Sequence, residues 1–183
     1  MGFIMKILMT TSVLALLISA QCQAADQAAQ LSISGNVRDG NQSCSVTLDR
    51  SSIELFGDMD SLINQSETIK VGANVRLNVA SDYSEQSQKC RQLAAEGKLA
   101  YRFIGQADNA DGTSLANMAV SPGAAKGIGV GLYNNSTLIR VNTDTLQAND
   151  YGNTLSLTMV KLNGQAHAPG KVESALTIQF ERL

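Results

Sequence analysis

The sequence predicts an all-β protein, a β-sandwich built from short strands. Apolar and polar residues alternate over runs of about six to fourteen residues, and a period of two is that of a half-buried strand. Clusters of Gly, Pro, Asn and Asp separate these runs, and such spacing is typical of a sandwich. The segment 84–97 has some helical character, but its apolar content is too low for a buried helical face. We expect a loop there, with at most a single turn of helix.

The expected strands, in chain order, are 30–37, 44–49, 52–57, 68–80, 98–105, 127–134, 136–142, 154–163 and 170–183. The expected turns lie at 39–41, 108–112, 122–123, 134–135, 149–152 and 169–170. The C-terminal strand has the clearest pattern, because Leu176, Ile178 and Phe180 alternate with polar residues. The chain has no Trp and few other aromatic residues, so aliphatic side chains must build most of the core.

The first 24 residues have the pattern of a secretory signal peptide, with cleavage expected after Ala24. Lys6 precedes an apolar run from Ile7 to Ala20, and small or short polar residues follow it. The run has about 14 residues, whereas a transmembrane helix needs roughly 20. Cys22 could be the lipid-modified cysteine of a lipoprotein. Residues 19–21 before it match a lipobox poorly, which disfavours this interpretation. We therefore expect this segment to be removed on export.

The mature chain, 25–183, has the length of one domain and is weakly acidic. Loss of Lys6 leaves 13 basic against 16 acidic residues, a net charge of −3. That charge disfavours nucleic acid and anionic membranes as partners, because both favour a basic surface. Cys44 and Cys90 are an even pair in an exported chain, so we expect them to form a disulfide. Two free thiols are the alternative.

Residues suited to catalysis are sparse. His167 is the only histidine, and it lies in a turn-like stretch, so we expect an exposed side chain rather than a member of a nucleophilic site. Two acidic pairs, Asp58 with Asp60 and Asp108 with Asp111, lack the spacing of a calcium-binding loop, and we expect solvated turns. The sequence therefore predicts no enzyme, no cofactor and no metal site.

Four features follow one another in a specific order. An alternating run with a central glycine, 30–37, precedes the first cysteine, and the second cysteine follows 46 residues later. A Gly-rich strand, a turn and another strand occupy 124–142, and the closing strand has Gly170 as the 14th residue from the end. Together these features resemble the pilin subunits of chaperone–usher fimbriae, the type 1 and P pilus group. The resemblance covers the whole mature chain.

The resemblance implies an incomplete immunoglobulin-like β-sandwich that lacks the seventh strand of that fold, which leaves a hydrophobic groove beside the C-terminal strand. Residues 25–40 would be an N-terminal donor-strand extension, and 41–183 would be the pilin domain. A periplasmic pilus chaperone would fill the resulting groove first. At an outer-membrane usher, the extension of a neighbouring fimbrial subunit would replace the chaperone. The implied function is a structural subunit of a fimbrium on the bacterial cell surface that supports cell adhesion, with a host-surface receptor as a further partner.

The sequence contains its own candidate donor strand. Ala29, Leu31, Ile33, Gly35 and Val37 recur at every second position, so all share one face of an extended strand. By the resemblance, they would occupy successive pockets of a neighbour's groove, with Gly35 at the shallow one. The residues alone leave an alternative open, in which this segment is the protein's own first strand and completes its own sheet.

By the same resemblance, Gly170, Leu176, Ile178 and Phe180 would belong to the strand that flanks the groove and docks to the chaperone. The chain departs from the family pattern in two places. The family usually has a penultimate tyrosine, whereas three residues follow Phe180 here, which shifts the terminal carboxylate that a chaperone holds. The stretch 81–89 before Cys90 reads as a loop insertion.

The alternative function is a single-domain secreted adhesive module that recognises a host glycan or protein. Such a module would use an exposed aromatic platform, and the chain offers no Trp and only four Tyr for one.

Overall fold

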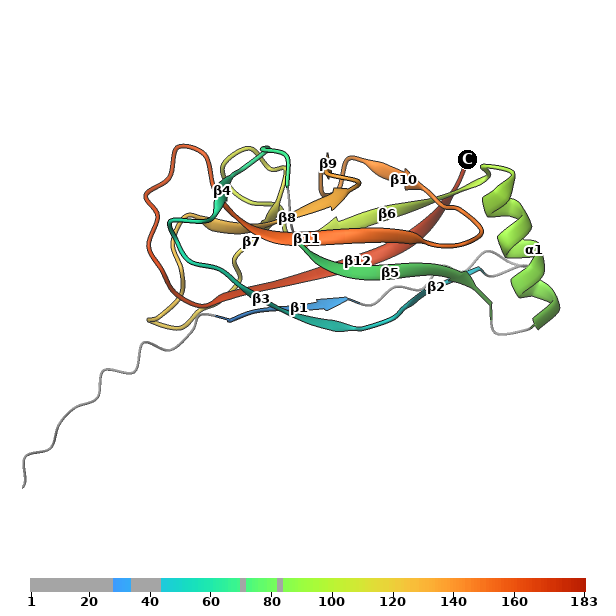
Figure 1. Ribbon diagram of the computed structural model, residues 1–183, viewed down its shortest axis with the longest axis horizontal. Helices are drawn as coiled ribbons and strands as arrows, with labels where there is room; N and C mark the ends of the chain where they lie inside the picture. The colour runs from blue at the N-terminus through green and yellow to red at the C-terminus, as the bar shows by residue number, and fades with distance from the viewer. Residues whose placement is uncertain (1–27, 34–43, 70–71, 82–83) are drawn as a thin grey trace, which may run out of the picture.

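The computed structural model describes residues 28–33, 44–69, 72–81 and 84–183, and these form twelve strands and one helix (Figure 1). The elements are β1 (Ala28–Ile33), β2 (Ser45–Leu48), β3 (Ser52–Phe56), β4 (Ile63–Asn64), β5 (Ala73–Ala80), α1 (Ser84–Ala95), β6 (Leu99–Gly105), β7 (Leu115–Ala116), β8 (Ile128–Asn134), β9 (Thr137–Ile139), β10 (Thr145–Gln147), β11 (Asn153–Lys161) and β12 (Val172–Arg182).

The strands form two sheets that pack face to face. The five-stranded sheet has the order β10-β6-β12-β1-β3, and the main path of the seven-stranded sheet is β2-β5-β11-β8-β7. Two short strands join that second sheet at its sides, where β4 pairs with β11 and β9 pairs with β8. The predicted all-β class is confirmed.

The core lies between the two sheets and is mainly aliphatic. Strands expose and bury successive residues, as in β12, where every second residue from Val172 to Phe180 is buried. Aromatic side chains contribute at one end, where the rings of Tyr101 and Phe180 lie 5.0 Å apart between centroids. Burial raises the pKa of the Tyr101 phenol. The predicted aliphatic core is therefore supplemented by a small aromatic contact.

The predicted strands are present over the described residues, with shorter bounds in several cases. The run 68–80 becomes a strand only from Ala73, and 136–142 only over β9. The turn predicted at 134–135 lies one residue later, because Asn134 still belongs to β8. Asn135 and Ser136 join β8 to β9 with positive φ of 47° and 66°, as a two-residue hairpin turn requires. Three short strands, β4, β7 and β10, were not predicted.

The expected loop at 84–97 is wrong, because Ser84–Ala95 form the helix α1. Local backbone hydrogen bonds define the C-terminal end of this helix. Gly97 has φ +71°, its amide donates to the Ala94 carbonyl, and the Lys98 amide donates to the Leu93 carbonyl, which is the Schellman arrangement. The buried face of the helix is narrow, so the periodicity of the sequence gave little indication of it. The stretch before Cys90 is thus helical rather than an inserted loop.

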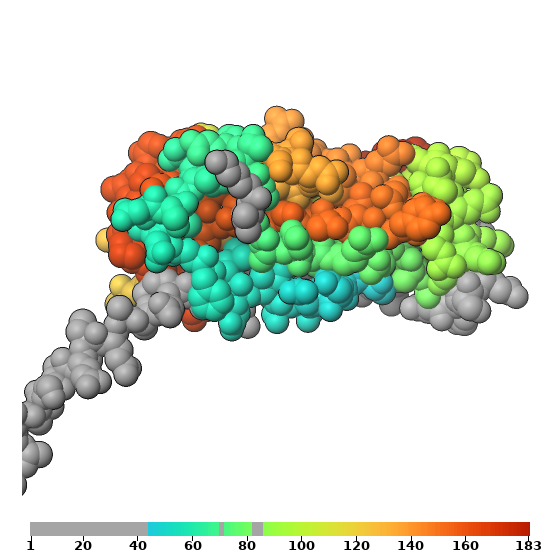
Figure 2. All heavy atoms as spheres, viewed as in Figure 1, coloured from blue at the N-terminus to red at the C-terminus, as the bar shows by residue number. Residues whose placement is uncertain are grey.

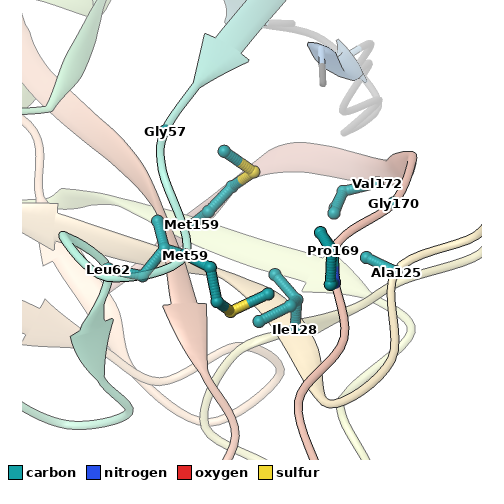
Figure 3. A pocket seen from close by; sticks show the side chains of 9 residues that line it. All are labelled: Gly57, Met59, Leu62, Ala125, Ile128, Met159, Pro169, Gly170 and Val172. Atoms are coloured by element: carbon teal, nitrogen blue, oxygen red, sulfur yellow. The ribbon is translucent and has the colours of Figure 1, made fainter. Parts of the chain in front are cut away.

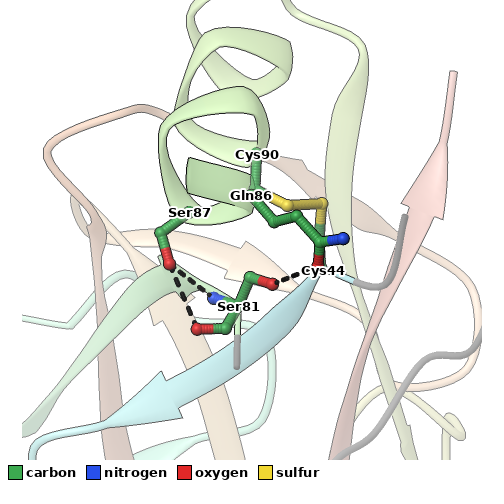
Figure 4. Close-up of a disulfide and its surroundings, with 5 residues drawn as sticks. All are labelled: Cys44, Ser81, Gln86, Ser87 and Cys90. Atoms are coloured by element: carbon green, nitrogen blue, oxygen red, sulfur yellow. Dashed lines mark hydrogen bonds between the residues drawn. A yellow bond between two sulfur atoms is a disulfide. The ribbon is translucent and has the colours of Figure 1, made fainter. Parts of the chain in front are cut away.

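The predicted disulfide joins α1 to the residue before β2 (Figure 4). The Cα atoms of Cys44 and Cys90 lie 5.7 Å apart, and both residues are buried. Beside them, the Ser87 hydroxyl donates to the Ser81 carbonyl at 3.1 Å and accepts a hydrogen bond from the Ser81 amide. The helix is therefore held to the sandwich by one covalent bond and by hydrogen bonds near its beginning.

The expectation of a solvated turn at Asp108 is also wrong, because the Asp108 side chain is buried. Its carboxylate accepts hydrogen bonds from the backbone amides of Ala110 and Ser114, each at 2.8 Å, and of Gly112 at 3.2 Å. The side-chain amide of Gln65 donates a further bond at 2.8 Å. Burial alone would raise the pKa of Asp108, but these donors outweigh it and lower that pKa.

We predict that Cys44→Ser lowers the free energy of unfolding. A closed loop of 46 residues corresponds to about 4 kcal/mol in the chain-entropy description of a disulfide. Urea unfolding of the mature chain measures the loss, and reduction of the wild-type chain should reproduce it. Unchanged stability after both treatments would contradict a stabilising role for the disulfide.

We predict that Asp108→Asn destabilises the protein at neutral pH by about 1–3 kcal/mol, because an amide cannot accept the same set of hydrogen bonds. A lowered folded-state pKa stabilises the fold fully above the unfolded pKa of about 3.9, and this stabilisation is lost as the pH falls through the folded-state pKa. The gap between wild type and variant should therefore shrink from neutral pH to about pH 2. Urea unfolding at both pH values checks this, and a constant gap would count against it.

Candidate functional site

The candidate functional site is the slot between β12 and β3 in the five-stranded sheet, which β1 occupies (Figure 1). Among the described residues, β12 and β3 are connected through β1 and do not pair with each other. β1 runs parallel to β12 and antiparallel to β3. An N-terminal segment thus completes a sheet whose remaining strands all follow Cys44 in the chain.

The backbone register aligns β1 with buried positions on both neighbours. Leu31 is level with Ser174 of β12 and with Ile53 of β3, and Ile33 is level with Leu176. These three partners are all buried. The remaining predicted donor residue of β1, Ala29, is level with Val172 and Leu55, while Gly35 and Val37 lie outside the described residues.

The inward side chains of β12 are buried, as the alternation of the C-terminal strand predicted. Leu176 and Ile178 are each 1% exposed, and Phe180 is 7% exposed. Ser174, the polar member of this set, is satisfied because its hydroxyl donates to the Ala116 carbonyl at 2.7 Å. The inward face of β12 thus carries no charged side chain.

The two edges of β12 are covered over different lengths. On one edge, β6 pairs with β12 from Leu176 to Arg182. On the slot edge, β1 pairs with it from Val172 to Leu176. Within the described ranges, no strand pairs with the slot edge beyond Leu176. The slot is therefore longer than the part that β1 fills with described residues.

The beginning of β12 lies beyond the end of β6 and is held by the segment around Asn117. The Asn117 side chain donates to the carbonyls of Ala125 and Lys171, each at 3.0 Å, and accepts from the Glu173 amide at 2.9 Å. The Met118 amide donates to the Glu173 carbonyl at 2.6 Å. The amide and the carbonyl of Glu173 are thus both hydrogen-bonded, although residues 117 and 118 do not belong to a strand. Nothing in the sequence pattern indicated this role for Asn117.

Gly170, one of the predicted site residues, has a steric role at the same place. A Cβ atom here would lie 2.4 Å from the Ala125 nitrogen and 2.4 Å from the Gly123 oxygen. The Lys171 amide donates to the Gly123 carbonyl at 2.8 Å, which fixes this close approach. The glycine therefore allows the chain before β12 to pack against 123–125.

A small apolar cavity of about 30 Å³ lies beside the beginning of β12, where the ends of the two sheets meet (Figure 3). The side chains of Met59 and Met159 point into it. The cavity is lined by Gly57, Met59, Leu62, Ala125, Ile128, Met159, Pro169, Gly170 and Val172. A space of this size accepts a methyl group or a water molecule rather than a small-molecule ligand.

The chemistry of the slot is that of strand binding. Apart from Ser174, the inward side chains of β12 from Val172 to Phe180 are apolar, and the edges of the slot are the main-chain groups of β12 and β3. Charges stay on the outside, where Lys171 pairs with Glu173 and Arg102 lies 3.7 Å from Glu181. Extended peptides bind such an edge through main-chain hydrogen bonds, while alternate side chains in pockets set the register.

Other candidate sites are not assembled by the described residues. His167 is exposed, as expected, and its Nε2 lies 3.0 Å from the Leu162 carbonyl oxygen. Among the described residues, no group of three His, Cys, Asp or Glu side chains could hold a metal ion. In the same part of the chain, no helix is long and apolar enough to cross a membrane.

No protein-family model matches the chain, and no curated protein is similar to it.

We predict that Gly170→Ala destabilises the fold by about 1–3 kcal/mol, because the added methyl group must displace the backbone of 123–125. Gly123→Ala is the matched control, since a Cβ at Gly123 meets no atom within 4 Å. Thermal unfolding of both variants tests the difference. Equal midpoints for the two would show that the close approach at Gly170 is relaxed in solution.

Proposed function

We propose that the chain is a structural subunit of a bacterial surface fimbrium and polymerises by exchange of the β1 segment between copies. The observation that carries the proposal is the position of β1 between β12 and β3. This strand precedes Cys44, the first residue of the disulfide-closed body. It can therefore leave the slot without breaking the order of any other strand.

An empty slot would raise the free energy of the folded subunit. Filling the slot with another strand would remove this cost, and this free-energy difference would drive the exchange. The edges of β12 and β3 would lose main-chain partners over the paired residues, and buried unpaired backbone groups are unfavourable. Val172 and Leu176, the inward apolar residues of β12 that are level with β1, would lose a neighbouring strand. Any extended segment with alternating apolar residues could fill the same slot, whether it comes from the same chain, a chaperone or the next subunit.

The export signal and the pilin resemblance set the cellular context of this proposal. The mature subunit would be held in the periplasm by a chaperone strand in the slot and delivered to an outer-membrane usher. Its finer fold would be an immunoglobulin-like sandwich completed in trans. The proposed role is structural and adhesive, because the slot offers main-chain groups and apolar side chains to an extended strand.

A second candidate function has an observation in its favour. The pairing of β1 with β12 and β3 of its own chain is also what a self-contained secreted binding module would have. In that case β1 is an ordinary first strand, and the module would bind a host glycan or protein elsewhere on its surface. The two functions differ in whether the slot accepts a strand in trans.

We predict that a mature chain carrying Leu31→Asp and Ile33→Asp accepts a synthetic peptide spanning 25–38. The substitutions disable its own β1, because charged residues replace apolar ones at positions level with buried neighbours. At peptide concentrations about 100-fold above Kd, the thermal midpoint should rise by about 5–10 °C. The measurement is thermal unfolding with and without peptide.

A peptide with Gly35→Leu is the matched control for the pocket assignment, and a peptide with Leu31→Asp tests the apolar anchor. We expect neither to raise the midpoint as the natural peptide does. A disabled chain that ignores all three peptides would favour the self-contained module. Equal stabilisation by the natural and Gly35→Leu peptides would retain strand exchange but remove the special role of Gly35.

A further inference from the structure

An open cleft of about 620 Å³ lies between the β3–β4 connection and the segment that follows β4. In Figure 2 these two stretches, coloured teal and green, lie on the face turned to the viewer, and β4 pairs there with β11. Only one of the lining residues, Phe56, also pairs with β1. A cleft of this volume fits a small molecule, and strand exchange gives it no role.

The apolar wall of the cleft consists of four side chains with different exposure. Phe56, at the end of β3, is 65% exposed, whereas Ile69 is 6% exposed. Leu62 and Ile63 lie between them in the chain and are half-buried. The Leu62 amide donates to the Asp58 carbonyl at 3.2 Å, which holds the β3–β4 connection in a turn. A molecule seated in the cleft would therefore cover apolar surface, including an exposed aromatic side chain.

Glu67 gives the cleft a negative charge in a fixed position. Asn64 donates to both carboxylate oxygens, from its backbone amide at 3.1 Å and from its side-chain amide at 2.7 Å. These bonds lower the pKa of Glu67, and the charge of Lys161 lowers it further. Within the described ranges, however, Glu67 forms no ion pair. Each oxygen retains a lone pair, so the carboxylate can accept further hydrogen bonds from a ligand.

A buried hydroxyl group without a partner adjoins the cleft. The Tyr133 hydroxyl is buried and makes no hydrogen bond to any described residue. A Cβ atom at Gly131 would lie 3.1 Å from this hydroxyl oxygen, and Gly131 is level with Thr158, which lines the cleft. Level residues on neighbouring strands face the same side about 5 Å apart, so the hydroxyl lies beside the cleft wall. Buried polar atoms normally have a partner, and an N–H group of a ligand could supply one here.

The side chains of the cleft favour a positively charged, partly apolar molecule. A carboxylate accepts hydrogen bonds from an ammonium group, and the face of an aromatic ring attracts the same positive charge. Glu67 and Phe56 bring both features to one cleft. The aliphatic part of the wall offers a surface on which a hydrocarbon group leaves contact with water. An organic anion would instead be repelled by Glu67.

We propose that this cleft binds an organic ammonium ion that carries an apolar group, with the ammonium at Glu67 and the apolar group against Phe56 and Ile69. A free amine and the lysine side chain of a partner protein both present this chemistry. Binding here does not depend on the strand exchange proposed above, because no residue of β12 lines the cleft among those that the structure describes.

The test is a titration of the isotope-labelled mature chain with phenethylammonium, followed by NMR of the backbone amides. The amide signals of the cleft residues should shift together. Glu67→Gln should weaken binding by about fivefold, because it removes the charge, and Phe56→Ala by about threefold. Glu96→Gln is the matched control and should bind like the wild type. Glu96 is also an exposed carboxylate with side-chain donors, Gln92 and Lys98, but it follows α1 at the other end of the molecule (Figure 1).

Thermal unfolding establishes whether each variant is folded. If Glu67→Gln does not fold, Thr158→Lys replaces it, because an ammonium group attached to the cleft wall would compete with the added amine. That variant should also bind phenethylammonium more weakly than the wild type does.

Three further compounds separate the charge, the apolar group and the source of the ammonium. Phenylacetate has the same ring with a negative charge, and methylammonium has the charge without the ring, so we expect both to bind more weakly. Equal binding of either, no shift of the cleft signals, or unchanged binding by Glu67→Gln would overturn the proposed site. Binding of N-acetyl-lysine amide as tightly as phenethylammonium would support a lysine side chain as the source, and weaker binding would support a free amine.

Discussion

The structure depends on the main-chain pairing of β1 with β12 and β3. Each of these two strands needs a neighbour on its inner edge, and one short segment at the N-terminal end of the chain supplies both. The neighbouring elements support β12 on its other edge and on its inward face. β6 supports the other edge of β12, and the seven-stranded sheet covers the apolar face that β12 turns inward.

Most strands could be predicted from the sequence because alternation is a local property. Leu176, Ile178 and Phe180 are buried as their spacing indicated. The short strands β4, β7 and β10 could not be predicted, since two or three residues are too few to show a period. α1 was missed for a different reason, because its buried face is narrow and a distant cysteine holds it in place.

The slot could be predicted in part. The segments 30–37 and 170–183 were both visible as alternating runs, but the sequence did not establish whether they meet within one chain. Asn117 and Ser174 lay outside any motif, because their roles come from hydrogen bonds to residues far away in the chain. Gly170 was singled out by its position in a family pattern, whereas the structure adds a physical reason, the close approach of 123–125.

The pairing of β1 inside its own chain also has a kinetic consequence. A strand that is tethered to its binding site by a short segment acts at an effective concentration in the millimolar range. An incoming strand at micromolar concentration competes poorly with it on encounter alone. Replacement would then be limited by the rate at which β1 detaches, and that rate is independent of how many other strands surround the molecule. The pairing of β1 with β12 and β3 would thus set the time scale on which the slot accepts another strand.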